Sequence, residues 1–224
     1  MTNTATPRIV VLVSGEGSNL EAILDAVRDG RLQARVAAVI SNRPEANALR
    51  RAAGHGIAGE ALDHRAYVSR EAFDEALARA IDAHRPELVV LAGFMRILTP
   101  AFVNHYLGRM LNIHPSLLPA YPGLHTHARA LADGAERHGA SVHFVTAELD
   151  GGPVVLQGWV PIRTGDTPEN LASRVLEVEH CLYPLAIGWF VAGRLRLDGK
   201  RATLDGIPLE RPWQLDYGAE APHP

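Results

Sequence analysis

A short apolar run that leads directly into a glycine-rich turn is the strongest constraint on how this chain folds. Residues Ile9 to Val13 read IVVLV, and the turn SGEGSNL follows at Ser14 to Leu20. A continuous β-branched run is typical of a strand covered on both faces. A helical pattern of apolar residues over 20–27 comes next and stops near Gly30. This strand–turn–helix unit indicates a parallel sheet flanked by helices.

The same alternation continues through the first half of the chain. Apolar runs at Val36 to Ile40, Leu88 to Ala92 and Met110 to Ile113 predict further buried strands. Helical patterns separate them around residues 45–53 and 69–84. We therefore expect an α/β fold built on a doubly wound, mostly parallel sheet.

The second half of the chain has a different pattern. Residues 141–146 and 154–160 predict two strands that pair as an antiparallel hairpin across the loop AELDGGP. Residues 167–192 predict one long C-terminal helix, with Thr167 as its N-cap. Residues 194–209 suggest a small terminal hairpin.

The length of 224 residues suits one domain over 1–224, ordered from about residue 8 to 209, with loose ends at 1–7 and 210–224. Hydrophobic residues make up 47% of the chain, enough to fill a core. The net charge is −3, from 22 basic and 25 acidic side chains. This balance argues against nucleic acid or an anionic membrane as a partner.

A single cysteine, Cys181, and the absence of a long apolar stretch point to the cytoplasm. The neighbours of Cys181 suggest a small buried hydrophobic side chain and not a nucleophile. The sequence does not distinguish a monomer from a homodimer.

The first turn is a candidate phosphate site. Glycines at a helix N-terminus expose backbone N–H groups, here those of Gly17, Ser18 and Asn19. A dinucleotide fingerprint would need glycine at Leu20 and an acid near residues 41–43, and both are missing. One phosphate monoester is therefore the favoured ligand, and a plain helix-capping turn is the alternative.

Three polar residues are candidates for catalysis. Asn112 and His114 lie at the end of a predicted strand, where a period of two places both side chains on one face. An amide donor beside an imidazole suits a carbonyl oxygen that becomes negative during attack. Asp150 begins the turn DGG in the later loop. Taken singly, each residue could instead serve a loop, a turn or the buried core.

Two other types of chemistry are disfavoured. His125 and His127 have a metal-ligand spacing, but no carboxylate or cysteine at matching spacing accompanies them, so we expect no metal. No G-x-S-x-G motif is present, and Ser141 inside a strand is a poor nucleophile, which argues against a covalent mechanism.

Four segments go further than these physical arguments. SGEGSNL, LAGFMRIL, LNIHPSLLPAYPG and HGASVHFVTAELDGGPVV together resemble the folate-dependent glycinamide ribonucleotide formyltransferases of purine synthesis. The likeness runs in order from about Arg8 to Gly193. It implies a formyltransferase-like variant of the Rossmann fold, with 10-formyl-tetrahydrofolate as cosubstrate, small-molecule substrates, and no metal.

The resemblance also assigns the site. It implies Asn112, His114 and Asp150 as the catalytic trio, the substrate phosphate on the turn at 17–19, and the ribose near Glu179. It implies that His125, Ser141 and His143 line the cleft or support it. The implied folate contacts are Arg70 (at the glutamate tail), Leu91, Phe94, Met95, Arg96, Ile97, Leu98 and the backbone from Val145 to Asp150.

Two residues depart from the family pattern. Glu16 places a carboxylate inside the phosphate turn, and we expect its side chain to point away from the phosphate. Leu176 stands where relatives often have a polar or basic residue.

The nearest rival is a formyl-tetrahydrofolate hydrolase, whose relatives usually carry an N-terminal regulatory domain. Formyltransferases that act on methionyl-tRNA or amino sugars usually continue into a further C-terminal domain. A nucleotide-binding oxidoreductase is disfavoured by Leu20 and Asn42, and a non-catalytic ligand-binding protein is disfavoured by the polar trio.

Overall fold

The computed structural model describes residues 5–216, and its centre is an eight-stranded sheet of order β11-β7-β6-β5-β4-β1-β2-β3. In chain order these strands are β1 (Arg8–Val13), β2 (Arg35–Ser41), β3 (Gly59–Ala61), β4 (Leu88–Leu91), β5 (Met110–His114), β6 (Arg137–Phe144), β7 (Val154–Pro161) and β11 (Trp213–Asp216). Strands β1 to β5 are parallel, and β6 runs against both β5 and β7. The expected doubly wound, mostly parallel sheet with an antiparallel hairpin is confirmed.

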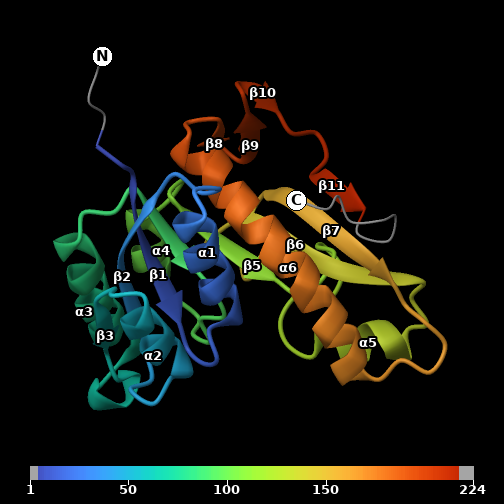
Figure 1. Cartoon of the computed structure of the whole chain (residues 1–224), viewed down its shortest axis with the longest axis horizontal. Coiled ribbons are helices and arrows are strands. Elements are labelled where there is room, and N and C mark those ends of the chain that lie inside the picture. Colours follow the sequence, from blue (N-terminus) through green and yellow to red (C-terminus); the bar gives the residue numbers. More distant parts are fainter. Residues whose placement is uncertain (1–4, 217–224) are drawn as a thin grey trace.

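Helices cover both faces of the sheet (Figure 1). They are α1 (Ser18–Arg28), α2 (Asn47–Gly54), α3 (Arg70–Ala83), α4 (Pro100–His105), α5 (Thr126–Ala132) and α6 (Pro168–Val191), with a short 3-10 helix, η1 (His64–Ala66). Apolar residues of α1, α2 and α6 pack on one face, and those of α3 and α4 on the other. Along β1 the side chains alternate between the two clusters, because successive residues of a strand point to opposite faces.

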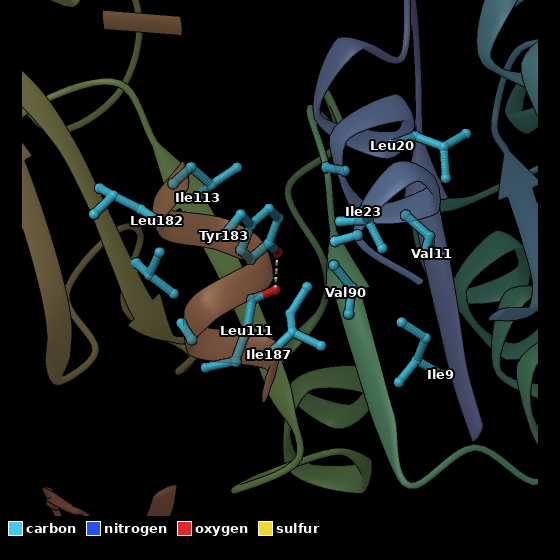
Figure 2. Packing of buried hydrophobic residues seen from close by; sticks show 14 of the residues in the cluster. Ile9, Val11, Leu20, Ile23, Val90, Leu111, Ile113, Leu182, Tyr183 and Ile187 are labelled. Atoms are coloured by element: carbon cyan, nitrogen blue, oxygen red, sulfur yellow. Dashed lines mark hydrogen bonds between the residues drawn. The ribbon is translucent and has the colours of Figure 1, made fainter. Parts of the chain in front are cut away.

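Helix α6 confirms the predicted long C-terminal helix. The side chain of Thr167 accepts a hydrogen bond from the backbone N–H of Asn170, as expected for an N-cap. Figure 2 shows Tyr183 of α6 packed among buried residues, with its hydroxyl near Leu111. That hydroxyl lies 2.9 Å from the carbonyl oxygens of both Leu91 and Leu111. The helix is thereby attached to β4 and β5, the strands that carry the site.

A separate three-stranded antiparallel sheet follows α6. It consists of β8 (Leu195–Asp198), β9 (Arg201–Leu204) and β10 (Ile207–Pro208), in the order β10-β9-β8. None of the helices within residues 5–216 has the length and hydropathy that a membrane span requires.

Two expectations need correction. Residues 213–216 of the supposedly loose C-terminal tail form β11, which pairs in parallel with β7, and Trp213 there contacts Trp189 of α6. Residues 217–224 and 1–4 lie outside the described part of the chain. Cys181 is exposed and not buried, because it lies with Leu185 on the outward side of α6.

Candidate active site

The site lies where the order of the strands reverses. From β1 the chain continues to β2 and β3 on one side, and later returns to β4 and β5 on the other. In open α/β sheets, ligands bind outside the carboxyl ends of the strands at such a point. The turn after β1 and the loop after β4 meet there, since the backbone N–H of Met95 donates to the Ser14 hydroxyl at 2.7 Å.

The turn after β1 presents the start of α1. Gly17 has a φ of 76° and is the N-cap residue of α1. A β-carbon at Gly17 would come within 2.6 Å of Cβ of Ala48, so both conformation and space require glycine. The first N–H groups of a helix have no acceptor within the helix, so Ser18 and Asn19 direct theirs outward. This geometry suits an anion.

Glu179 lies beside the turn. It is 7% exposed, and the Asn19 side-chain amide donates to its carboxylate at 2.6 Å. Burial raises the pKa of Glu179 to about 7. The other amide atom of Asn19, Oδ1, is buried without a hydrogen-bond partner. Asn19 and Glu179 thus form a polar pair from α1 and α6 that could bind hydroxyl groups.

The structure also locates the two departures from the family pattern. The Glu16 carboxylate accepts a hydrogen bond from the Asn47 side-chain amide at 3.0 Å, so it is held toward α2. The Glu16 carbonyl accepts from Nε of Arg51 at 2.8 Å. Leu176 is half-buried on α6, one turn before Glu179.

Asn112, His114 and Asp150 converge, as the sequence predicts. Asn112 and His114 are two residues apart on β5, and Asp150 reaches them from the loop between β6 and β7. Oδ2 of Asp150 is 3.6 Å from Nδ1 of His114, and both side chains are less than a tenth exposed. Oδ1 of Asp150 is 3.8 Å from Nε2 of His143. The Asn112 amide, the Asp150 carboxylate and the imidazole rings of His114 and His143 therefore lie close together.

Backbone groups of the loop after β5 form hydrogen bonds with His114 and Asp150. Nε2 of His114 lies 3.0 Å from the carbonyl oxygen of Tyr121. The N–H of Gly123 donates to Oδ2 of Asp150 at 2.8 Å. Tyr121 and Asp150 both have positive φ, 55° and 52°, which is uncommon for residues other than glycine. These backbone contacts could not be predicted from residue types and their spacing in the sequence.

A cavity opens beside Asn112 and Asp150. Its lining contains both apolar and polar side chains. It is lined by Leu91, Phe94, Arg96, Ile97, Leu98, Val103, Asn112, His143, Val145, Thr146, Ala147, Glu148, Leu149 and Asp150. It thus contains most of the predicted folate contacts, including the segment 145–150, and adds Val103. Apolar walls with a few polar groups are typical of sites for small organic ligands.

Two of the predicted folate residues do not line this cavity. Met95 is 61% exposed, and its contribution to the site is the backbone bond to Ser14. Arg70 begins α3, three residues before Phe73, which places the two on neighbouring positions of one helix face. The guanidinium of Arg96 lies 5.3 Å from the centroid of the Phe73 ring. Arg70 and Arg96 are therefore near the same end of α3.

Ser141, His125 and His127 do not line this cavity. The Ser141 hydroxyl donates to the Ser116 carbonyl at 2.6 Å and accepts from the Leu118 N–H at 3.0 Å, so it fixes the loop after β5. His125 is the N-cap residue of α5, with a φ of 57°. The His127 ring packs edge-on against His138 at 5.1 Å.

Comparisons with known proteins agree with this geometry. A sequence model described as formyl transferase matches residues 7–187. Phosphoribosylglycinamide formyltransferase of Escherichia coli is 57% identical over 201 residues, covering 90% of this chain and 95% of that protein. The solved phosphoribosylglycinamide formyltransferase of Coxiella burnetii has a TM-score of 0.91 at 48% identity, covering 94% of this chain and 100% of the other.

The rival activity has a more distant relative. A formyltetrahydrofolate deformylase from Pseudomonas syringae has a TM-score of 0.82 at 27% identity, covering 90% of this chain and 66% of that chain. The fold is thus common to both activities, while the identity of 57% and 48% to the two transferases above is well above 27%. The chain belongs to the formyl transferase family.

Proposed function

We propose that this protein transfers the formyl group of 10-formyl-tetrahydrofolate to the amine of glycinamide ribonucleotide, a step of de novo purine biosynthesis. The observation that carries the proposal is the convergence of Asn112, His114 and Asp150 beside a cavity that Asn112 and Asp150 line, together with the glycine turn at the start of α1. Relatives with high identity over nearly the whole chain carry the corresponding name.

The ribonucleotide would bind at the turn after β1. Its phosphate would accept hydrogen bonds from the backbone N–H groups of Gly17, Ser18 and Asn19. Its ribose hydroxyls would meet the carboxyl group of Glu179, which is already bonded to Asn19. The Glu16 carboxylate, held by Asn47, leaves the phosphate position free of a negative charge.

The formyl-folate would occupy the cavity after β4. Its pterin would lie against apolar side chains such as Leu91, Ile97 and Val145. Nε of Arg96 is buried without a hydrogen-bond partner in the structure, and together with Arg70 this cation is suited to the glutamate carboxylates of the tail. The donors present thus fit an anionic, partly aromatic cosubstrate.

Catalysis would proceed by direct attack of the amine on the formyl carbon. A new C–N bond forms, the carbonyl oxygen becomes negative, and the bond to the folate nitrogen breaks when that nitrogen is protonated. Asn112 donates a hydrogen bond to the developing oxyanion, an interaction commonly worth about 3 kcal/mol.

His114 would support the same negative charge as an imidazolium. Its two nitrogens face the Tyr121 carbonyl and the Asp150 carboxylate, which are both acceptors, and this arrangement favours a ring with two N–H groups. Asp150 stabilises that cation and can take the amine proton through a water molecule.

Small molecules are therefore the proposed partners, and the net charge of −3 argues against nucleic acid. We propose a cytoplasmic location, in keeping with purine biosynthesis and a single cysteine.

The test is a spectrophotometric assay of purified protein with 10-formyl-tetrahydrofolate, with and without glycinamide ribonucleotide. The proposal predicts loss of formyl-folate that depends on the ribonucleotide and yields the formylated product. Equal loss without the ribonucleotide would identify a hydrolase. Unchanged formyl-folate in both reactions would contradict the proposal.

A further inference from the structure

His143 lies directly opposite Asn112 in the sheet. The two residues are partners in the antiparallel ladder of β5 and β6, so their side chains lie on the same face. Nε2 of His143 is 3.0 Å from Nδ2 of Asn112. His143 is 2% exposed, and both residues line the cavity that also contains Asp150. The imidazole is therefore within hydrogen-bond distance of the amide assigned to the oxyanion.

The surroundings determine which nitrogen of His143 carries a proton. Nδ1 lies 2.9 Å from the carbonyl oxygen of Phe144, and a carbonyl oxygen can only accept. Nδ1 must therefore be the N–H. Burial lowers the pKa of His143, which favours the neutral ring. Nε2 of that neutral ring has no hydrogen and is an acceptor.

This tautomer fixes the orientation of the Asn112 amide. An acceptor at Nε2 requires the NH₂ group of Asn112 to face it, because the amide oxygen would meet a second lone pair there. One of the two Nδ2 hydrogens then bonds to His143, and the other remains available to a ligand in the cavity that Asn112 lines.

We propose that His143 is a positioning residue for formyl transfer: as a neutral acceptor, it holds the Asn112 amide with its free N–H directed at the carbonyl oxygen under attack. This inference rests on the proposed function and adds to it a role for His143, which orients the Asn112 amide before the substrate binds. Preorganised donors stabilise a developing charge without reorienting during the reaction.

Substitutions at His143 separate positioning from packing. His143→Leu removes the acceptor and fills the space with an apolar side chain of similar size. His143→Gln retains a hydrogen-bond acceptor, the amide oxygen, at a distance from the backbone similar to that of Nε2. We expect kcat to fall roughly 10- to 100-fold in His143→Leu, with both KM values within about threefold. We expect His143→Gln to regain most of that loss.

A double mutant tests whether the effect passes through Asn112. In the Asn112→Ala background, adding His143→Leu should lower kcat by less than about threefold further, because the group being positioned is already gone. A kcat of His143→Leu within about twofold of wild type would overturn the proposal. So would losses that multiply in the double mutant, which would indicate a general packing role.

Nitrogen NMR of uniformly ¹⁵N-labelled wild-type protein tests the tautomer without any turnover. The expected spectrum has a protonated Nδ1 and an unprotonated Nε2 for His143, assigned by comparison with His143→Gln. A protonated Nε2 would contradict the positioning role. If His143→Gln folds poorly, through-bond correlation of the ring nitrogens with the His143 backbone in wild-type protein gives the same assignment. The wild-type assay with and without the ribonucleotide separately reports whether the proposed function itself fails.

Discussion

The two ends of the proposed site would recognise their ligands by different means. At the proposed phosphate end, the groups that would bind the ligand are backbone N–H groups, fixed by the chain conformation at Gly17 and the start of α1. At the catalytic end, the functional atoms are side-chain termini, held by other side chains and by carbonyl groups such as that of Tyr121. The comparison teaches that side-chain truncation should damage the catalytic end most, while the phosphate end depends mainly on backbone geometry.

The largest effect should come from Asn112→Ala. Removal of one oxyanion donor commonly costs about 100- to 1000-fold in kcat. Steady-state kinetics should show this loss with a nearly unchanged KM for the ribonucleotide. Asn104→Ala, at an exposed position of α4, is the matched control and should keep normal turnover. A near-normal kcat in Asn112→Ala would contradict the proposal that the catalytic end depends on this side chain.

Glu179→Gln should change the pH dependence of stability. The pKa of Glu179 is about 7 in the folded protein, above its ordinary value of 4.5. Between these values the folded state holds more protons than the unfolded state, so the contribution of Glu179 to stability decreases as pH rises from about 4.5 to 7. The full difference is on the order of 3 kcal/mol.

Denaturant titrations between pH 5 and pH 8, values chosen to bracket most of this window, measure the effect. Relative to wild type, Glu179→Gln should become more stable as pH rises, while its KM for the ribonucleotide increases through loss of the ribose contact. Glu177→Gln, at an exposed position of the same helix, should follow wild type. A constant stability difference between Glu179→Gln and wild type would show that burial does not affect this carboxyl group.

Gly17→Ala should impair the phosphate end through the backbone. Its φ of 76° is unfavourable for alanine, and the new β-carbon would meet Ala48. We expect the KM for the ribonucleotide to rise at least about tenfold, with a loss of roughly 1–3 kcal/mol in stability. The control is Gly30→Ala, with a φ of 74°, where a β-carbon would meet no atom closer than Nε2 of Gln33 at 3.9 Å; Gly30 has no place in the proposed site. It should lose stability and keep a normal KM, and an equal KM effect in both variants would argue against a phosphate role for the turn.

Ser18→Ala should have the smallest effect. Ser18 is proposed to contribute its backbone N–H, which alanine retains, so we expect a KM for the ribonucleotide within about threefold of wild type. Asn19→Ala is the informative contrast, because it removes the bond to Glu179 and should raise KM more. A larger effect at Ser18 than at Asn19 would indicate binding through the Ser18 hydroxyl.

Much of the fold could be predicted because its strands are continuous apolar runs and its long helix has a clear N-cap. The elements that were missed lack such patterns. Strand β3 is three mostly exposed residues, Gly59–Ala61, and α4 and α5 are short helices of six and seven residues. Strand β11 forms only because residues 213–216 pair with the edge strand β7, a tertiary contact that local sequence does not encode.

The proximity of Asn112, His114 and Asp150 could be suggested from a strand end, the turn DGG and residue type, while their proposed catalytic role came from the family resemblance. The partners of these residues could not be predicted. The pairing of Asn112 with His143 depends on the register of β5 against β6, and the contacts from Tyr121 and Gly123 depend on loop conformation. The burial of Glu179, which raises its pKa, depends on how α6 packs against α1.

The most direct test of the account is to measure kcat and the KM for glycinamide ribonucleotide side by side in Asn112→Ala and Gly17→Ala. The account predicts a loss confined mainly to kcat in the first variant and mainly to KM in the second. The opposite division, or an equal loss of both constants in both variants, would contradict the separation of the site into a side-chain catalytic end and a backbone phosphate end.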